Sequence, residues 1–372
     1  GDWTGLLMRA LFLALLAVFA LAAVALSQQS PEEEKSYFLR YVEDTISSDN
    51  RRISITGIDG VLSSDATIGA ITVADRKGVW LTITDAKITW TRSALLTGRL
   101  VIDRLSAASI AMTRMPVPDE SLPSPEAGGF SLPELPVSVR IGNLAVGEAT
   151  FAEAVFGEAA TLSLNGALAL ADGSLDAGLA IERLDGPGGT LALDAAFSND
   201  SRVLAIDLRA SEPADGVLAN LLNLEGRPAV DLSVKGEGPL SDFAADIALA
   251  ANGEEILQGR VAVNESGDAT GFTADLDGRV AVLAPAELRA FLGDRTSLSL
   301  SGTVPAEGGV IVERLRTQGG ALSLDASARV LPDGFLRRLD LSAVIDPVEG
   351  GRVILPSAGN ETSIGGARLA LT

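Results

Sequence analysis

The feature that most constrains this chain is an alternation of apolar and polar residues with a period of two, which dominates from residue 51 onward. In GVWLTITDAKITW, the side chains of Val79, Leu81 and Ile83 fall on one face, and Leu100 and Ile102 repeat the pattern. Asp-Gly pairs separate such runs at 59–60, 172–173, 277–278 and 333–334, and these pairs favour tight turns. The sequence therefore predicts many short antiparallel strands and few helices.

The chain also repeats itself. IERLDGPGGTLALDA, residues 181–195, returns as VERLRTQGGALSLDA, residues 312–326, with nine of fifteen positions identical and a constant offset of 131. We interpret each copy as a strand, a Gly-Gly turn and a second strand. LSLNG, LSVKG and LSLSG begin at Leu162, Leu232 and Leu298, at spacings of 70 and 66. The unit is therefore about 65–70 residues long, and its strands are interrupted by short helices predicted at 213–224 and 285–293.

Repetition of this kind indicates units that stack on their neighbours and do not each close a core. Tandem β-sandwich domains are the alternative, but units of this length are small for sandwiches. No linker separates the units after residue 138. We expect one continuous sheet.

The composition excludes several classes of function. The chain has no His and no Cys, which removes the commonest general base, thiol chemistry and the usual transition-metal ligands. Its net charge of −20 repels the phosphate backbone of nucleic acids. Acidic residues are spread over turns and strand ends, and no isolated pair of carboxylates stands out. We therefore expect no enzyme activity, no catalytic residue, no metal and no cofactor.

An apolar segment near the N-terminus predicts a membrane anchor. Residues 10–26, ALFLALLAVFALAAVAL, would span about 26 Å as a helix, and 6–8 extend it if Arg9 reaches the interface. Arg9 precedes the run and Glu32 to Glu34 follow it, which places residues 1–9 in the cytoplasm, the anchor at 10–27 and the remainder outside. A cleavable signal peptide is the alternative, since Ala23-Val24-Ala25 has suitable small residues, and either reading implies export.

Two further segments define the domain boundaries. Residues 28–50 hold a predicted amphipathic helix at about 31–48, which begins with Ser30-Pro31 and an acidic first turn. Residues 115–137 contain six prolines, so we interpret them as a linker or an edge excursion. This Pro-rich segment would divide a first β-unit, 51–114, from the repeated region, 138–372. Because the sequence closes on a strand-like GGARLALT, we expect that region to be truncated and the chain to be a fragment of a longer protein.

Two stretches carry a resemblance to a known family. TRSALLTGRLVIDRLSAASIAMTRMP, residues 91–116, and GRPAVDLSVKGEGPLSDFAADIAL, residues 226–249, resemble the TamB family of the AsmA-like superfamily. The resemblance implies a single-pass inner-membrane protein whose periplasmic part is a long curled antiparallel β-sheet, a groove with an apolar interior. It also implies a role in outer-membrane biogenesis, namely phospholipid transfer between membranes, assembly of outer-membrane proteins such as autotransporters, or both. The implied partner is an outer-membrane barrel of the TamA or BamA type, contacted through a C-terminal region outside this sequence.

The repeated motifs supply candidates for the lining of such a groove. They share period-two spacing, so they should form one apolar face, with Ser163, Ser233 and Ser299 on the other. Aliphatic side chains without charge suit acyl chains, which need burial and no specific hydrogen bonds. The candidates are Leu162, Leu164, Leu191, Leu193, Leu232, Val234, Leu298, Leu300, Leu322 and Leu324.

Two other functions are compatible with parts of the sequence. A secreted or surface β-repeat adhesin requires cleavage after the apolar segment and filled sandwich cores. A carboxylate-based glycosidase on a β-scaffold is disfavoured, because aromatic residues for sugar stacking make up only 4% of the chain.

Overall fold

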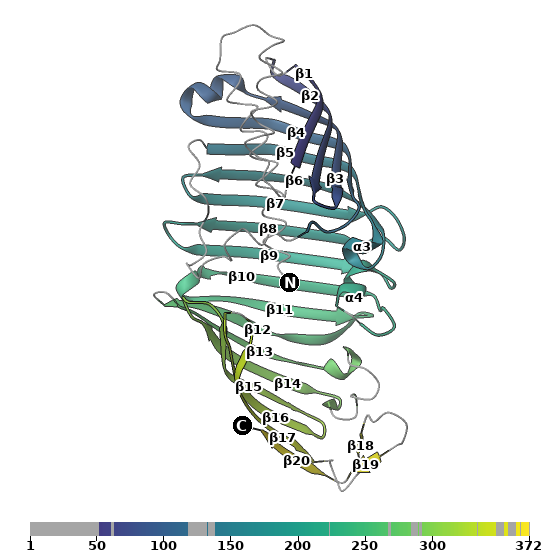
Figure 1. Cartoon of the computed structure of the whole chain (residues 1–372), viewed down its shortest axis with the longest axis vertical. Helices are drawn as coiled ribbons and strands as arrows, with labels where there is room; N and C mark the ends of the chain where they lie inside the picture. Colours follow the sequence, from purple (N-terminus) through teal and green to yellow (C-terminus); the bar gives the residue numbers. More distant parts are fainter. Residues whose placement is uncertain are drawn as a thin grey trace. The chain divides into compact units, whose positions relative to one another are not determined.

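The computed structural model describes residues 52–60, 63–117, 132, 138–222, 224–266, 269–283, 289, 292–332, 334–346, 353–355, 362–364 and 366–371. These residues are mainly β, with few and short helices (Figure 1), as the alternating pattern predicts. The described residues form two compact units, 52–117 with 138–186 and 132 with those from 187 onward. The division therefore falls within the first copy of the repeated fifteen-residue segment.

The sheet of the first unit contains seven strands that pair in chain order. They are β1 (Arg52–Asp59), β2 (Asp65–Asp75), β3 (Gly78–Trp90), β4 (Arg99–Met112), β5 (Ser138–Phe151), β6 (Ala160–Ala171) and β7 (Ser174–Arg183). A 3₁₀ turn, η1 (Arg92–Thr97), joins β3 to β4, and a short helix, α3 (Glu153–Phe156), joins β5 to β6. Figure 1 shows β1 to β3 running at a steep angle to β5–β7, which is the accumulated twist of successive strands.

One pairing in this unit corrects the expectation of a wholly antiparallel sheet. β4 and β5 are parallel, with Leu100 opposite Val139 and Ile102 opposite Ile141. A parallel pair requires a long crossover connection, because the chain must return to the end at which the first strand began. Residues 113–137 supply that length. The Pro-rich segment thus joins two neighbouring strands of one sheet.

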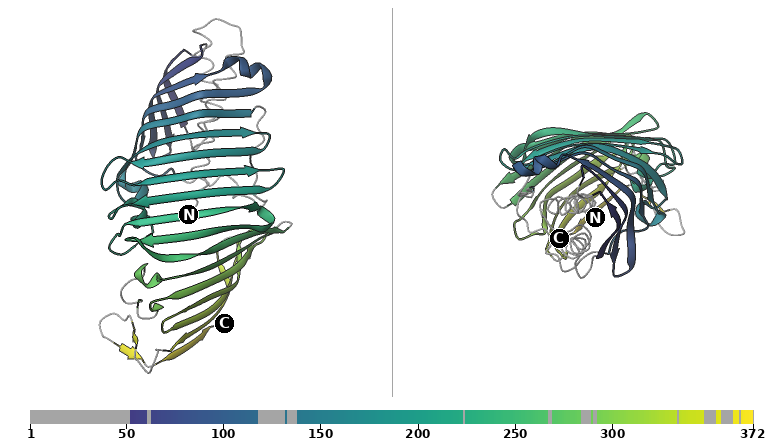
Figure 2. Two further views of the ribbon diagram at one scale, coloured as in Figure 1. Left: turned by 180° about the vertical axis from the view of Figure 1, so that it is seen from behind. Right: turned by 90° about the horizontal axis from the view of Figure 1, so that it is seen from above.

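The second unit continues the pattern with antiparallel strands. They are β8 (Thr190–Ser198), β9 (Val203–Glu212), β10 (Val230–Pro239), β11 (Phe243–Ala251), β12 (Glu254–Ser266), β13 (Ala269–Gly278), β14 (Thr296–Val304), β15 (Val310–Gly319), β16 (Leu322–Val330), β17 (Leu336–Ile345) and β20 (Ala367–Leu371). Neighbours in sequence pair with each other, except that β20 pairs with β17 while β18 (Val353–Leu355) and β19 (Thr362–Ile364) form a separate pair. Figure 2 shows these elements from behind and from above.

The short helices of this unit lie between strands. They are α4 (Val217–Leu221) between β9 and β10, η2 (Leu240–Asp242) between β10 and β11, and η3 (Val280–Leu283) after β13. The helix predicted at 213–224 is therefore present in shortened form as α4. Most of the helix predicted at 285–293 lies outside the described residues.

The expected fold class is thus confirmed at the level of strands and sheet. The sheet is open in each unit, and in neither unit is it curled into the expected groove. Among the described residues, no helix is both long and apolar enough to cross a membrane. The predicted anchor at 10–27 and the predicted helix at 31–48 lie outside the described part of the chain.

The predicted turns differ in outcome. Asp172 and Gly173 join β6 to β7 with φ of 49° and 66°, so both residues adopt the left-handed conformation that a tight type I′ hairpin needs. The turn predicted at 277–278 is wrong, because Gly278 belongs to β13 and lies opposite both Leu257 and Thr296. A Cβ atom at Gly278 would lie 2.1 Å from the carbonyl oxygen of Ile256. This glycine allows a close approach between strands and does not form a turn.

The two copies of the repeated segment also differ. In the second copy, β15 continues to Gly319, which lies opposite Leu322. The chain turns between them through Gly320, which has a positive φ, as predicted. In the first copy, β7 ends at Arg183 and β8 begins only at Thr190. The intervening sequence LDGPGG contains Pro187, which has no N–H for a strand ladder, and three glycines with positive φ. This local chemistry ends the strand early.

Candidate functional site: an apolar face in each unit

In the first unit, one face of the sheet is apolar from β1 to β7, except for Arg183 at the end of β7, which lies opposite Leu162. The pairing register places Ile55 opposite Ile71, Ile71 opposite Ile83 and Ile83 opposite Ile110. Residues directly opposite each other in a sheet point to the same side. Most of this face is buried over β1–β5, where Leu100 and Ile102 are 0% exposed, while Ile71, Ile83 and Ile110 are partly buried. The members of its core are Ile53, Ile55, Ile58, Ile68, Val73, Trp80, Ala86, Ile88, Trp90, Leu100, Ile102, Val139, Ile141 and Leu168.

Two of the predicted lining residues belong to this face. Leu162 lies opposite Ala149 and Leu164 lies opposite Val146, both of which are buried. Leu162 and Leu164 themselves are only half-buried. Burial on this face is therefore lower in the middle of β6, although Ala160, Leu168 and Leu170 on the same strand are buried.

In the second unit, the register brings all eight remaining candidates to one face of the sheet. Each lies opposite an apolar or small residue of the neighbouring strand, for example Leu232 opposite Ala210 and Leu249. Leu298 lies opposite Leu276, and Leu322 lies opposite Ile345. The residues that share this face are Leu191, Leu193, Leu232, Val234, Leu298, Leu300, Leu322 and Leu324.

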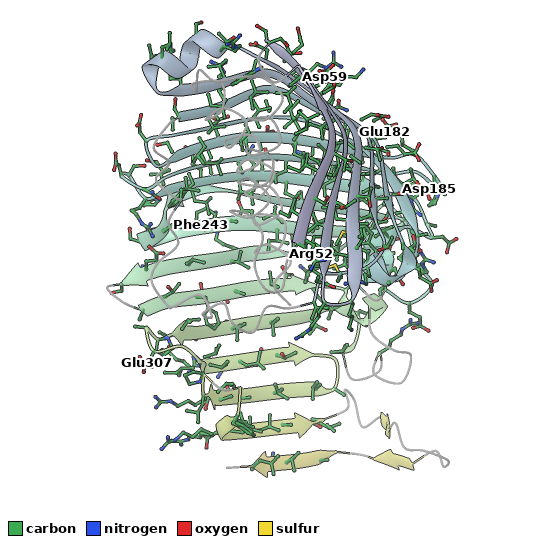
Figure 3. All side chains as sticks on the ribbon, turned by 45° about the horizontal axis from the view of Figure 1, so that its top comes forward. Arg52, Asp59, Glu182, Asp185, Phe243 and Glu307 are labelled. Atoms are coloured by element: carbon green, nitrogen blue, oxygen red, sulfur yellow. The ribbon has the colours of Figure 1, made fainter. Side chains whose placement is uncertain are left out.

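This second face is half-buried. All eight candidates have intermediate exposure, although the strands that carry them are well paired with their neighbours. From β8 to β17, the described residues of this face between its two ends carry no charged side chain, and its polar members are threonines such as Thr317. The sheet of the second unit thus presents a long aliphatic surface that is only half-buried. Figure 3 shows the described side chains on the ribbon.

Charged residues mark the ends of the strands on this face. At one end, the carboxylate of Glu212 accepts hydrogen bonds from the backbone N–H groups of Val217 and Leu218, at 2.7 and 2.5 Å. This contact holds α4 against β10 and β11, where Ala219 and Val230 are 1% exposed. At the other end, Glu265 on β12 binds Arg202 at 2.5 Å. The charged groups of this face therefore lie at the ends of the strands, where each has a hydrogen-bond partner, and the middle of the face is apolar.

The opposite face of the second sheet is polar and carries ion pairs between neighbouring strands. Lys235 and Asp207 lie directly opposite each other on β10 and β9, with Nζ and Oδ2 3.2 Å apart. The Lys235 ammonium, followed by the Arg209 guanidinium, holds the pKa of Asp207 below its usual range. Similar pairs join Arg260 to Asp246 at 2.9 Å and Arg316 to Asp325 at 2.7 Å.

The serines that were expected on this polar face lie there. Ser299 is opposite Asp275 and donates a hydrogen bond of 2.6 Å to its carboxylate. Ser233 is opposite Arg209, and Ser163 in the first unit is opposite Glu182. The alternation in the sequence therefore separates an aliphatic face from a charged face on every strand that carries a repeated motif.

The repeated motifs identified only part of the apolar surface. Leu208, Ile247, Leu257, Leu276 and Leu315 share the face in the second unit but stand outside LSL-type motifs. Their signal was the same period of two, which extends through strands whose exact sequence does not recur. Alternation alone would have found them.

The described residues hold no cluster of three or more acidic side chains arranged to bind a metal ion. Comparisons of the chain with protein-family models, with curated proteins and with solved structures find no match. The chemistry of the site thus rests on its geometry alone: an uncharged aliphatic surface backed by a charged one.

Proposed function

We propose that the apolar faces guide phospholipid acyl chains, and that the protein is an inner-membrane-anchored periplasmic protein of outer-membrane biogenesis. The observation that carries this proposal is the row of half-buried leucines across successive strands of the second unit, without a charged side chain between its rims. Acyl chains gain free energy from such a surface in proportion to the apolar area removed from water, about 25 cal/mol per Å². They need no directional contact, so they can slide along it.

The curled form of the sheet belongs to this proposal. Bending of the sheet around a lipid would turn the aliphatic face inward and leave the charged face in water. The ion pairs of the charged face are compatible with that arrangement, because residues such as Arg260 and Asp246 are well exposed. The TamB-like resemblance supports the same assignment, including a role in assembling outer-membrane proteins together with a barrel partner. An adhesin, in contrast, would be expected to fill the core against this face.

Site-specific photocrosslinking tests the proposal most directly. A photoreactive amino acid at Leu232, Leu300 or Leu324 should crosslink phospholipid in cells, whereas one at Ser233 or Ser299 should not. Each pair differs by one position in a strand, so the control shares the local fold and reverses only the face.

Charge substitution provides the functional arm. Leu232→Asp or Leu300→Asp places a carboxylate on the aliphatic face, where an unpaired charge is costly and draws in water. We expect these variants, expressed in the full-length protein, to lose most of their ability to repair an outer-membrane permeability defect. Ser233→Asp and Ser299→Asp should retain it. Equal crosslinking and equal repair by folded variants of both faces would contradict lipid guidance.

A further inference from the structure

The charge of the chain is distributed unevenly. Residues 51–114 contain nine Lys and Arg against five Asp and Glu, a net charge of +4. Residues 138–372 contain 17 basic and 33 acidic residues, a net charge of −16. Residues 51–114 are therefore basic within a strongly acidic protein, and such an asymmetry of charge favours an anionic partner.

Five exposed cations gather at one end of the first sheet. Lys87 lies near the end of β3, Arg92 in η1, Arg99 and Arg104 near the start of β4, and Arg140 near the start of β5. The register places Lys87 opposite Ser106, Arg104 opposite Thr89, and Arg140 opposite Val101. All three register positions are on the face opposite the apolar core. We call these five residues the basic end of the first unit.

Three cations of the basic end lack the cross-strand ion pairs that Arg260 and Arg316 form in the second unit. Among the described residues, Lys87, Arg104 and Arg140 form no ion pair, and Arg99 donates to the Thr97 hydroxyl at 3.1 Å. Asp65 and Asp103 lie at the same end, but they accept hydrogen bonds from Thr89 and Thr91, at 2.8 and 3.1 Å.

In the second unit, by contrast, Arg260 and Arg316 each lie opposite a carboxylate and bind it. Cross-strand ion pairs are therefore possible in this type of sheet, but Lys87, Arg104 and Arg140 of the basic end do not form one among the described residues.

An exposed apolar side chain lies beside these cations. Leu96 in η1 is 79% exposed, although Ala94 in the same turn is 6% exposed and packs inward. Thr97 stabilises the turn by donating to the Ala94 carbonyl at 2.8 Å. A leucine held outward near the exposed Arg99 combines the two contacts that a protein makes with an anionic bilayer. Its apolar group enters the interface, and the cations bind headgroup phosphates.

We propose that the basic end of the first unit docks on an anionic phospholipid surface, with Leu96 entering the headgroup region. This proposal deepens the lipid-guiding function proposed above and rests on it for the choice of a membrane as the anion. Docking at this end would bring the start of the apolar face, on β1–β4, to the membrane that supplies the lipid.

The absence of cysteine from the chain makes a local test possible. Leu96→Cys in the full chain, labelled with an environment-sensitive fluorophore, is reconstituted into vesicles of phosphatidylcholine alone or with roughly one third phosphatidylglycerol. We expect a several-fold rise in emission with a blue shift only in the anionic vesicles. Raising the salt concentration to about 0.5 M should reverse most of that change, since headgroup attraction is screened.

Two charge-reversed triples provide the comparison. Arg99→Glu/Arg104→Glu/Arg140→Glu should abolish the response of the probe. Arg314→Glu/Arg329→Glu/Arg337→Glu makes the same change of charge at exposed arginines of the second unit and should preserve it.

Three results would overturn docking: equal emission in both kinds of vesicle, equal loss in both triples, or the same response to soluble polyglutamate without vesicles. The last would assign the surface to an acidic protein. Crosslinking at Leu232 reports on lipid guidance independently, so failure of docking and failure of the function are distinguishable.

Discussion

At the scale of the residue, Asp75 shows how one carboxylate secures a chain crossover. Its side chain is 4% exposed and binds the Arg114 guanidinium through two bonds of 2.6 and 2.7 Å. It also accepts hydrogen bonds from the backbone N–H groups of Lys77 and Val117, at 2.7 and 2.8 Å. The crossover to β5 begins after β4. The contacts of Asp75 therefore tie the start of this crossover to the β2–β3 turn.

This arrangement predicts a pH-dependent contribution to stability. The Arg114 guanidinium and the two N–H donors hold the pKa of Asp75 well below its usual range. A depressed carboxyl pKa stabilises the fold above the unfolded value, about 3.9, and the contribution is lost progressively as the pH falls below it. Asp75→Asn should therefore lower the free energy of unfolding by about 1–2 kcal/mol at pH 7 and by less at pH 3, as measured by urea titration. An equal loss of unfolding free energy at pH 7 and at pH 3 would contradict an ionic origin of this stabilisation.

Glu212 is a second residue whose role follows from its contacts. It satisfies two backbone donors at the start of α4, and burial leaves those donors no water as a substitute. We expect Glu212→Ala to lower the free energy of unfolding by about 1–3 kcal/mol. Glu237→Ala, which removes an exposed carboxylate from β10, is the matched control and should change stability little. Comparable effects of both substitutions in thermal denaturation would argue against capping.

At the scale of the element, the strands were predictable and one of their pairings was not. A period of two depends only on which face each residue occupies, so it is visible along the chain wherever one face is buried. The parallel pairing of β4 with β5 depends on where the chain returns after residues 113–137. Proline content shows that such a segment is not a strand but does not reveal its destination.

Prediction of the candidate site from the sequence has the same limit: alternation shows the face of a residue but not which strands become neighbours. The leucine faces of β10 and β14 follow directly from alternation, and the register places them as predicted. The basic end was missed, because Lys87, Arg104 and Arg140 are far apart in the sequence and meet only through pairing across β3, β4 and β5. A separate count of charge for each β-region would have shown the asymmetry, but not the side of the sheet that carries it.

A side-chain amide anchors the connection before β5. Asn199, at the β8–β9 turn, accepts a hydrogen bond from the Leu132 N–H at 2.8 Å and donates one to the Leu132 carbonyl at 2.9 Å. Leu132 is itself 5% exposed. We expect Asn199→Ala to make residues 113–137 several-fold more susceptible to limited proteolysis, with a smaller loss of overall stability. Asp200→Ala, at the exposed neighbouring position, should leave the cleavage rate unchanged, and equal cleavage in both variants would exclude the anchor.

At the scale of the whole molecule, the net charge of −20 opposes the compact state through repulsion. The exposed ion pairs act in the other direction, but each contributes only about 0–1 kcal/mol and is weakened by the same salt. We therefore expect the midpoint of thermal unfolding to rise when the salt concentration increases from about 10 to 200 mM. A falling midpoint in differential scanning calorimetry would show that the ion pairs dominate.

The pairing of each strand from β8 to β17 with its neighbours in sequence has a consequence for the evolution of the gene. Each of these strands depends on the strand before it and the strand after it, and antiparallel hairpins return the chain to the edge from which it started. A gene that encodes such a sheet can gain or lose a pair of strands by duplication or deletion without disturbing the faces of the others. Each pair changes the width of the sheet by about 9.6 Å. Descendants of one ancestral gene could thus be fitted to different spans, while a change by a single strand would reverse the direction of everything that follows.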